Sequence, residues 1–396
     1  MAEKKKKFKV LIIHNYYQIP GGEDTVVANE KEMLEQHGNT VILYSRNNSE
    51  LTEFSGVRKA LLPLSTVFNL RTYREVKKII KEKKIDIVHV HNTLNLISPA
   101  VYYAALSCKV PVIQTIHNFR LLCPGATFYR DGHICEECAE HGLKCSVKHS
   151  CYRKSKLQTI VCAVNTWIHR MTGVYGKINY ICLTEFNKEK LLMLKQIKRK
   201  QVYVKPNFVA GGDSELVPSK KNQNQFIFAG RIDKLKGIDI LLKAWKIMGT
   251  EAPRLIICGT GPMENWCREY IEVNRLLNVE MRGFLPNDDA KQLIAESKAL
   301  ILPTQWYEGF PMTIVEAYSV NTPVIGSDIG NVKSVITPGV TGELFEMGSS
   351  EQLVMAVKRC MEHGEYVFRT VNEMFSMEKN YKTMMSIYTE VCKGIE

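Results

Sequence analysis

The sequence predicts an α/β protein with two doubly wound, Rossmann-like domains that face each other across an interdomain cleft. Two series of short apolar runs support this prediction, because each run is followed by a stretch with helical spacing. A polar stretch around residues 211–225 separates the two series. Strands that alternate with helices form parallel sheets, and such sheets bind ligands beyond the carboxyl ends of their strands. The expected strands are 8–13, 41–44, 85–90, 112–116 and 180–183, then strands near Phe226, Leu255, Val279, Leu300 and Val324.

The domain limits follow from this pattern. A chain of 396 residues with 45% hydrophobic content is long enough for two domains with separate cores. We place the first domain at 1–205, with a cysteine-rich insert at 123–151, and the second domain at 206–370. The tail, 371–396, has helical spacing over 377–391.

Composition narrows the class of protein. The chain has no run of about eighteen apolar residues and no secretion signal at its start, so we expect it in the cytoplasm. Twelve cysteines in such a chain indicate thiols or metal ligands rather than a disulfide framework. The formal charge of +12 suits nucleic acid, anionic membranes or phosphorylated ligands. Because no arginine-rich stripe concentrates this charge, we favour a membrane and expect no nucleic-acid partner.

Glu308 and Glu316 form the most informative pair in the chain, with seven residues between them just after the apolar run 299–303. A buried strand that ends in a loop at Gly309, with Pro311 suited to the first turn of a helix, would aim free backbone amides at a diphosphate. The two carboxylates could hold hydroxyl groups of a sugar and of a ribose, the two parts of a nucleotide sugar. The ordinary alternative is a first-turn charge and a solvated helix face.

Three strand-and-turn segments precede this pair: Phe226 to Arg231 with Lys236-Gly237, then 255–262, then 281–285. In this serial order they resemble the nucleotide-binding half of family 4 glycosyltransferases, which are retaining enzymes of the two-Rossmann-domain (GT-B) type. The resemblance spans residues 226–346. It implies that the 371–396 tail crosses back to the first domain.

The resemblance implies roles for the second-domain residues. Arg231 and Lys236 would neutralise the departing diphosphate, with two surface cations as the alternative. Glu308 would contact the transferred sugar as a catalytic residue, and Glu316 the ribose. We expect neither a covalent nucleophile nor a catalytic metal, because the leaving phosphate can assist deprotonation of the acceptor. Further donor-binding candidates are Gly259, Gly261, Phe284, Leu285, Gly309, Phe310 and Pro311.

In the first domain, which the resemblance places on the acceptor side, His117 ends a predicted strand and matches the family histidine that contacts the donor sugar. It is the catalytic candidate of that domain. Gly21 and Gly22 match the glycine loop that faces the donor diphosphate and the acceptor, although a plain tight turn would also use them. Asn207 matches the interdomain asparagine of the family, with a turn residue as the alternative.

The cysteine-rich insert suggests a structural zinc site, because four thiolates are enough for tetrahedral zinc and one Cys-x2-Cys step has the right spacing. Reduced thiols without metal, or a redox pair, are the alternatives. His89 and His91 would point the same way from one strand, and we favour satisfied hydrogen bonds there over a metal pair. The proposed zinc ligands are Cys123, Cys135, Cys138 and Cys151.

Two basic, apolar segments could meet a lipid surface. Residues 71–81 and Lys4 to Lys7 place lysines and arginines beside an apolar helical face. Residues 154–171 have apolar side chains at helical spacing with basic ends, which suits a lipid acceptor or a membrane. We favour the plainer explanations here, a solvated face for 71–81 and a buried core helix for 154–171.

These observations predict a retaining glycosyltransferase that moves a sugar from a nucleotide-diphosphate sugar, a UDP-sugar, to a glycan or a polyprenyl-diphosphate-linked saccharide. The resemblance implies bacterial surface-polysaccharide assembly, peripheral to the inner face of the cell membrane. Two other classes stay open: a nucleotide-sugar epimerase on the same fold and a zinc-containing nucleic-acid-binding protein.

Overall fold

The computed structural model describes residues 6–18, 21–209 and 222–394, and the chain divides into two compact units. The first unit comprises Met1–Phe128, Cys135–Phe208 and Met377–Glu396, and the second comprises Tyr129–Ile134 and Val209–Ser376. The divisions after Phe208 and Ser376 fall a few residues beyond the limits expected at 205 and 370. Most of the expected linker, residues 210–221, and Lys4 and Lys5 lie outside the described residues.

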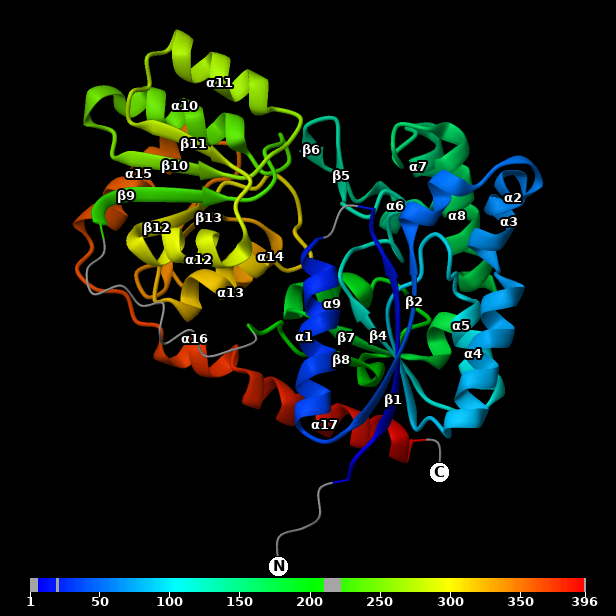
Figure 1. Cartoon of the computed structure of the whole chain (residues 1–396). Helices are drawn as coiled ribbons and strands as arrows, with labels where there is room; N and C mark the ends of the chain where they lie inside the picture. The colour runs from blue at the N-terminus through cyan, green and yellow to red at the C-terminus, as the bar shows by residue number, and fades with distance from the viewer. Residues whose placement is uncertain (1–5, 19–20, 210–221, 395–396) are drawn as a thin grey trace, which may run out of the picture. The chain divides into compact units, whose positions relative to one another are not determined.

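The first unit contains a six-stranded parallel sheet in the order β2-β1-β3-β4-β7-β8 (Figure 1). The last strand of this sheet has three residues and was not predicted. The strands of the first sheet are β1 (Lys9–Tyr16), β2 (Thr40–Asn47), β3 (Ile87–Asn92), β4 (Val112–Ile116), β7 (Asn179–Cys182) and β8 (Val202–Val204). Its main helices are α1 (Gly22–Gln36), α2 (Gly56–Ala60), α3 (Leu62–Val67), α4 (Leu70–Lys83), α5 (Ala100–Ser107), α8 (Lys156–Met171), α9 (Glu185–Leu191) and α17 (Met377–Lys393).

Helices cover both faces of this sheet, with α4 and α5 on the side opposite α1 in Figure 1. Side chains of β3 alternate between the two faces, so His89 and His91 share the face that α1 and α17 cover. The tail helix α17 packs within the first unit, where the Tyr388 ring meets the ring of Phe8 edge-on at 5.7 Å between centroids.

The second unit contains a six-stranded parallel sheet in the order β11-β10-β9-β12-β13-β14. Its strands are β9 (Asn222–Ala229), β10 (Arg254–Cys258), β11 (Val279–Gly283), β12 (Ser297–Leu302), β13 (Val324–Ser327) and β14 (Gly342–Phe345). Its helices are α10 (Ile238–Met248), α11 (Glu264–Val273), α12 (Asn287–Glu296), α13 (Met312–Ser319), α14 (Gly330–Val335), α15 (Ser350–Glu362) and α16 (Arg369–Met374). The prediction of two parallel-sheet, Rossmann-like domains is confirmed.

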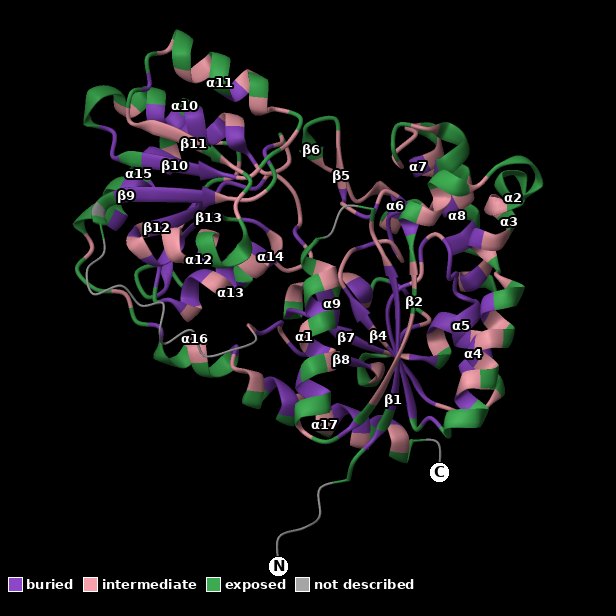
Figure 2. Ribbon diagram, in the orientation of Figure 1, coloured by how far each residue is buried: buried purple, intermediate pink, exposed green. Residues whose placement is uncertain are grey.

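The second sheet is buried on both faces (Figure 2). Phe226 and Phe228 of β9 pack in one core with Trp245, whereas Ile227 packs in the other core with Tyr318. We predicted that the polar residues 222–225 lie between the two strand series. This prediction is wrong, because these residues form the start of β9. Gln225 is buried, and its side-chain amide donates a hydrogen bond to the Ser297 hydroxyl at 3.2 Å.

The cysteine-rich insert forms short elements of its own. Strands β5 (Tyr129–Arg130) and β6 (His133–Ile134) pair antiparallel, and the helices α6 (Glu137–Glu140) and α7 (Lys144–Lys148) pack on each other.

Candidate functional site

The candidate site of the second unit lies where the strand order of its sheet reverses. Strand β9 is flanked by β10 on one side and by β12 on the other, and the chain continues outward in opposite directions from these two neighbours. Loops after the two central strands of such a sheet diverge and leave a crevice at the carboxyl edge. Here these loops are 230–237 after β9 and 303–311 after β12, and they carry Arg231, Lys236 and Glu308.

Backbone contacts hold these two loops against each other. Gly237 adopts φ +72°, and a Cβ atom there would lie 1.8 Å from the carbonyl oxygen of Pro303, so only glycine fits. The backbone N–H of Gln305 donates to the carbonyl oxygen of Leu235 at 2.8 Å. The Lys236-Gly237 step therefore fixes the position of the lysine relative to Glu308.

Glu308 lies at the centre of the site and is buried. Its Oε1 atom accepts from Lys236 Nζ at 2.6 Å and from the Thr304 hydroxyl at 2.9 Å. Its Oε2 atom has no partner among the residues that the structure describes. The Asn331 side chain of α14 donates to the backbone carbonyls of Glu308 and Gly309, which holds the loop in place. The carboxylate thus keeps one oxygen available for a ligand.

Trp306 completes the polar part of this site. The Lys236 ammonium lies 6.0 Å from the centroid of the Trp306 ring, within reach of a cation–π contact. The indole Nε1–H of Trp306 is buried without a hydrogen-bond partner in the described part of the chain. An unsatisfied buried donor costs about 1–3 kcal/mol, so a ligand oxygen that accepted from it would recover that loss. Sequence reasoning missed Thr304 and Asn331 and gave Trp306 no hydrogen-bonding role.

Arg231 lies on the open side of the loop after β9. Its side chain is 63% exposed and contacts Asp233 at 3.2 Å. Asp233 also accepts from the backbone N–H of Lys236 at 2.9 Å, so this aspartate contacts both the Arg231 side chain and the Lys236 backbone. An exposed guanidinium can leave such a weak pair for a phosphate, which it can bind with two parallel hydrogen bonds.

Helix α13 places Glu316 beyond the same loop. The helix begins at Met312, one residue after Pro311, which occupies the N-cap position with φ −73°. Phe310 packs edge-on against Phe375 at 6.0 Å between ring centroids. Glu316, half-buried, is the fifth residue of the helix.

The two glycines after β10 have a packing role. A Cβ atom on Gly259 would lie 1.9 Å from the carbonyl oxygen of Gly230, and one on Gly261 would lie 2.2 Å from that of Ile232. The residues after β11 differ from each other, because Phe284 is 75% exposed and Leu285 packs on the core. The structure brings Gly259 and Gly261 to the loop of Arg231 through these backbone contacts.

In the first unit, His117 follows β4 and lies within a cluster of histidines. Its Nε2 atom lies 2.9 Å from Nδ1 of His91, and the two rings stack with centroids 5.2 Å apart. Burial and the nearby His14, His89 and Lys205 hold the pKa of His117 well below its usual value, so the ring is neutral. His117 and His91 also line a small polar cavity of about 40 Å³.

In the first unit, the Asp24 side chain of helix α1 caps the backbone of the preceding glycine loop. Gly21 precedes α1, and its backbone N–H donates to Asp24 at 3.0 Å. Asp24 also contacts His14 at 2.7 Å, and burial raises the pKa of Glu23 to about 8. A phosphate at this helix terminus would therefore meet Asp24 and Glu23, whereas a hydroxyl group could donate to them. Gly22 is the first residue of the helix.

Asn207 follows β8 and is buried, and its Oδ1 atom has no partner among the described residues. The next residue along, Phe208, is the last residue of the first unit before the division.

The thiols of the insert gather around Cys138. Burial, together with the neighbouring Cys123, Cys151 and Cys145, raises the pKa of Cys138 to about 12. Three sulfur atoms of the insert do not come within 4.8 Å of one another in the described structure, so zinc would have to draw these thiols together. Cys135 donates its backbone N–H to the carbonyl oxygen of Phe128 at 2.8 Å.

Helix α8 is oriented opposite to the buried core helix that we predicted for 154–171. Its large apolar residues face solvent, with Leu157, Trp167 and Met171 between 55% and 70% exposed. Its polar side is buried instead, because His169 contacts the Val67 carbonyl oxygen and the Tyr103 hydroxyl, each at 2.9 Å. Within the described residues, no helix is both long enough and apolar enough to span a bilayer.

The fold and the switch-point site of the second unit are those of a GT-B glycosyltransferase. Residues 213–374 match the family "Glycosyl transferases group 1", and residues 20–210 match "Glycosyltransferase Family 4". The chain belongs to family 4 of the glycosyltransferases, as the residues predicted, and is a transferase. Family membership decides between the two enzyme classes in favour of the transferase.

Relatives of known structure or named activity agree with this assignment. The chain is 24% identical over 380 residues to the UDP-Gal:alpha-D-GlcNAc-diphosphoundecaprenol alpha-1,3-galactosyltransferase of Escherichia coli, covering 89% of this chain and 88% of that protein. A glycosyltransferase from Rickettsia africae superposes with a TM-score of 0.68 at 18% identity, covering 97% of this chain and 98% of that one. Anabaena Alr3699/HepE in complex with UDP and glucose gives a TM-score of 0.58 at 16% identity, with 98% of both chains covered.

Proposed function

We propose that the protein is a retaining glycosyltransferase that transfers a sugar from a UDP-sugar to a polyprenyl-diphosphate-linked saccharide during bacterial surface-polysaccharide assembly. The observation that carries this proposal is the switch-point site of the second unit, where Lys236, Glu308 and the unpartnered Trp306 indole meet. The named galactosyltransferase relative, which uses a UDP-sugar and a diphosphoundecaprenol-linked acceptor, supports the choice of donor and acceptor.

The charges of the site suit this reaction. A departing UDP gains negative charge, which Lys236 and the exposed Arg231 can neutralise. The Oε2 atom of Glu308 accepts hydrogen bonds from hydroxyl groups of the transferred sugar, and the Glu316 carboxylate accepts hydrogen bonds from hydroxyl groups of the ribose. We assign no step to a catalytic metal, because Lys236 and Arg231 supply the positive charge. In the first unit, we propose that His117 contacts the donor sugar and that Gly21, Gly22 and Asn207 are donor-binding residues.

Ligand-induced stabilisation tests the proposed donor. We expect UDP and one UDP-sugar to raise the melting temperature, and guanosine and adenosine diphosphates to leave it unchanged. The Arg231→Ala and Glu316→Ala variants should lose this response, whereas Arg268→Ala, which breaks an exposed pair with Glu264 on α11, should keep it. A wild-type protein that no nucleotide stabilises would refute the assignment of the site.

We further propose that the first unit docks on a membrane through an apolar face formed by α2, α3 and α8. Val57, Leu61 and Leu64 of the α2–α3 segment are 51–74% exposed. Helix α3 packs on α8, and both helices carry exposed residues (Figure 2), so we propose that these apolar side chains belong to one surface. Large apolar side chains that gather in this way mark an interaction site.

Charge selects the partner of this face. Exposed basic residues flank it at Arg58, Lys59, Arg153, Lys154 and Lys156. Apolar side chains that enter a bilayer, with basic residues at headgroup level, are the pattern of proteins that lie on anionic membranes. A polyprenyl-linked acceptor would be encountered on that surface.

Vesicle sedimentation tests the apolar face. The protein should sediment with phosphatidylglycerol vesicles and stay in solution with phosphatidylcholine vesicles. A Leu157→Ser/Trp167→Ser/Met171→Ser variant should lose binding. The matched control is Val273→Ser/Leu277→Ser in the second unit, which removes apolar side chains that are 73% and 96% exposed. If the wild-type protein does not bind vesicles and the α8 variant loses self-association, the membrane proposal is wrong and the face is an interface between copies of the chain.

We also propose that the thiols of the insert bind one structural zinc ion, with Cys138 at the centre of the site. Cys135 and Cys138 supply the Cys-x2-Cys step, and Cys123 and Cys151 approach each other across Gly125, whose ideal Cβ lies 3.7 Å from the Cys123 sulfur and 3.4 Å from the Cys151 Cβ. The purified protein should contain one equivalent of zinc. Cys138→Ser should lose it, and Cys182→Ser, in strand β7, should keep it. A purified wild-type protein that contains well below one equivalent of zinc would refute this proposal.

A further inference from the structure

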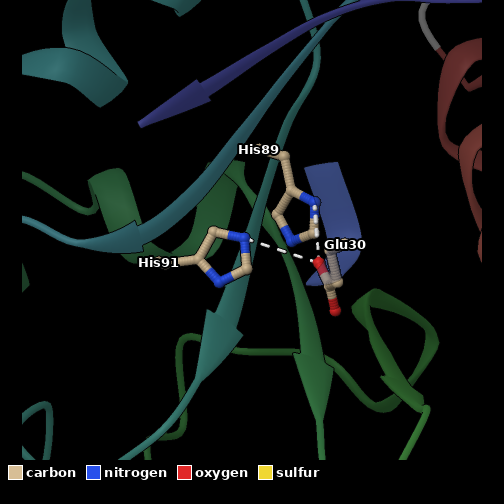
Figure 3. A group of neighbouring side chains, drawn as sticks. All are labelled: Glu30, His89 and His91. Carbon is tan, nitrogen blue, oxygen red and sulfur yellow. Dashed lines mark ion pairs between the residues drawn. The ribbon is translucent and has the colours of Figure 1, made fainter. Parts of the chain in front are cut away.

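The buried carboxylate of Glu30 lies beside the rings of His89 and His91 in the first unit (Figure 3). Its Oε1 atom accepts from Lys205 Nζ at 2.8 Å, and the lysine also donates to Asn380 at 2.8 Å. Its Oε2 atom lies 3.5 Å from Nε2 of His91 and 3.8 Å from Nδ1 of His89. One oxygen of Glu30 is thus paired with a lysine, while the other oxygen faces two imidazole rings.

The surroundings of His89 show why this group is not a metal site. Its Nδ1 atom lies 2.7 Å from the Tyr388 hydroxyl, and its Nε2 atom lies 2.7 Å from the Thr115 hydroxyl. Both ring nitrogens are therefore engaged, and neither has a lone pair free for a metal ion. The Lys205 ammonium, bound to the same carboxylate, would also repel a cation.

The Nε2 atom of His91, unlike the ring nitrogens of His89, has no hydrogen-bond partner in the described residues. Among buried side-chain atoms of the described residues, both Nε2 of His91 and Oε2 of Glu30 lack a hydrogen-bond partner, and they face each other. A carboxylate oxygen can only accept, so the compatible state of His91 carries its proton on Nε2. Nδ1 of His91 must then accept, because a neutral imidazole has one donor and one acceptor.

That requirement passes to His117. Its Nε2 atom, 2.9 Å from the accepting Nδ1 of His91, must carry the proton, which leaves Nδ1 of His117 as an acceptor. We propose that Glu30 and His91 are positioning residues that fix the tautomer of His117, so that Nδ1 of His117 accepts a hydrogen bond from a hydroxyl group of the donor sugar. This inference rests on the proposed function only for the identity of that hydroxyl group.

A Glu30→Gln variant reverses the chain of donors and acceptors. Lys205 requires the amide oxygen, so the amide NH₂ would point at Nε2 of His91, which then has to accept. The proton of His91 moves to Nδ1, and the proton of His117 moves from Nε2 to Nδ1. Long-range proton–nitrogen NMR correlations of ¹⁵N-histidine-labelled protein distinguish the two tautomers without any turnover, and His117→Asn assigns the signals.

We expect the Nε2–H tautomer of His117 in the wild type and the Nδ1–H tautomer in Glu30→Gln. Transfer should slow by about 10- to 100-fold, the usual loss when a partner that orients an imidazole is removed. Because Glu30→Gln alters a buried ion pair and could impair folding, His91→Phe serves as a second variant, in which both tautomers of His117 should appear. Tyr388→Phe, which removes a partner of His89 alone, should change neither tautomer nor rate.

The Nδ1–H tautomer in the wild type, or an unchanged tautomer in both Glu30→Gln and His91→Phe, would overturn the proposal. If the tautomer shifts as expected and the wild type transfers no sugar from any nucleotide donor, the positioning chain stands and the proposed function fails.

Discussion

Replacing Glu308 by Gln tests whether this carboxylate holds the transferred sugar. The glutamine keeps an oxygen for Lys236 and Thr304, which lie 2.6 and 2.9 Å from Oε1, and so preserves the loop. It places an NH₂ group where Oε2 is free, and that group cannot accept from sugar hydroxyls. A hydrogen bond to a charged group contributes about 1.5–3 kcal/mol, and an oriented transition-state contact about 2.7–4 kcal/mol, so losing this contact costs about 2–4 kcal/mol of transition-state binding.

This loss corresponds to a decrease of about 30- to 900-fold in kcat/KM. Initial rates with a UDP-sugar measure the decrease, and calorimetry with UDP alone gives the reference, because UDP lacks the transferred sugar. UDP affinity should stay within about threefold of the wild type. Thr304→Val is the matched control, since it removes one neutral hydroxyl and leaves the carboxylate. Equal losses for UDP and the UDP-sugar, or an unchanged kcat/KM, would refute the role of Glu308.

Three further predictions concern other parts of the chain. Lys205→Met leaves Glu30 buried without its counter-charge and should lower the free energy of unfolding by about 3–5 kcal/mol, whereas the double variant Lys205→Met/Glu30→Leu should recover most of it in urea denaturation. Recovery of nothing would mean that the pair is not the cause. Trp306→Phe should weaken UDP-sugar binding without lowering the melting temperature, because the indole N–H has no partner in the described structure to lose. A variant with unchanged affinity would contradict a ligand contact at that atom. Burial lowers the pKa of His89 to about 4. Since the unfolded histidine binds a proton below its ordinary pKa of 6.5, this residue should cost up to about 1.4 kcal/mol of stability per pH unit as the pH falls from 6.5 to 4. His89→Gln should flatten that slope, and an equally steep slope would assign the acid sensitivity elsewhere.

Apolar periodicity was enough to predict the fold class and the strands that frame both switch points, because buried parallel strands need continuous apolar runs. It did not detect β8 and β14, which are three and four residues long. Each of the two lies at the edge of its sheet with one neighbouring strand, and its structure depends on pairing with that neighbour.

The main residues of the second-unit site could also be predicted from the sequence. Arg231, Lys236 and Glu308 follow predicted strands directly, and the carboxyl ends of parallel strands converge, so linear order was a good guide to which residues meet. Asn331 could not be found in this way, because its contact with the loop of Glu308 depends on how α14 packs.

By itself the sequence determined the two-sheet architecture, the glycosyltransferase family and the residues at the strand ends, since each of these depends on local pattern. Tertiary structure alone decided which face of α8 is buried and that Glu30 lies within 3.5 Å of His91. The helical spacing of α8 shows that its apolar residues share a side but not whether that side meets protein or solvent. The pairing of Lys205 with Glu30 joins residues 175 positions apart, and only packing brings such groups together.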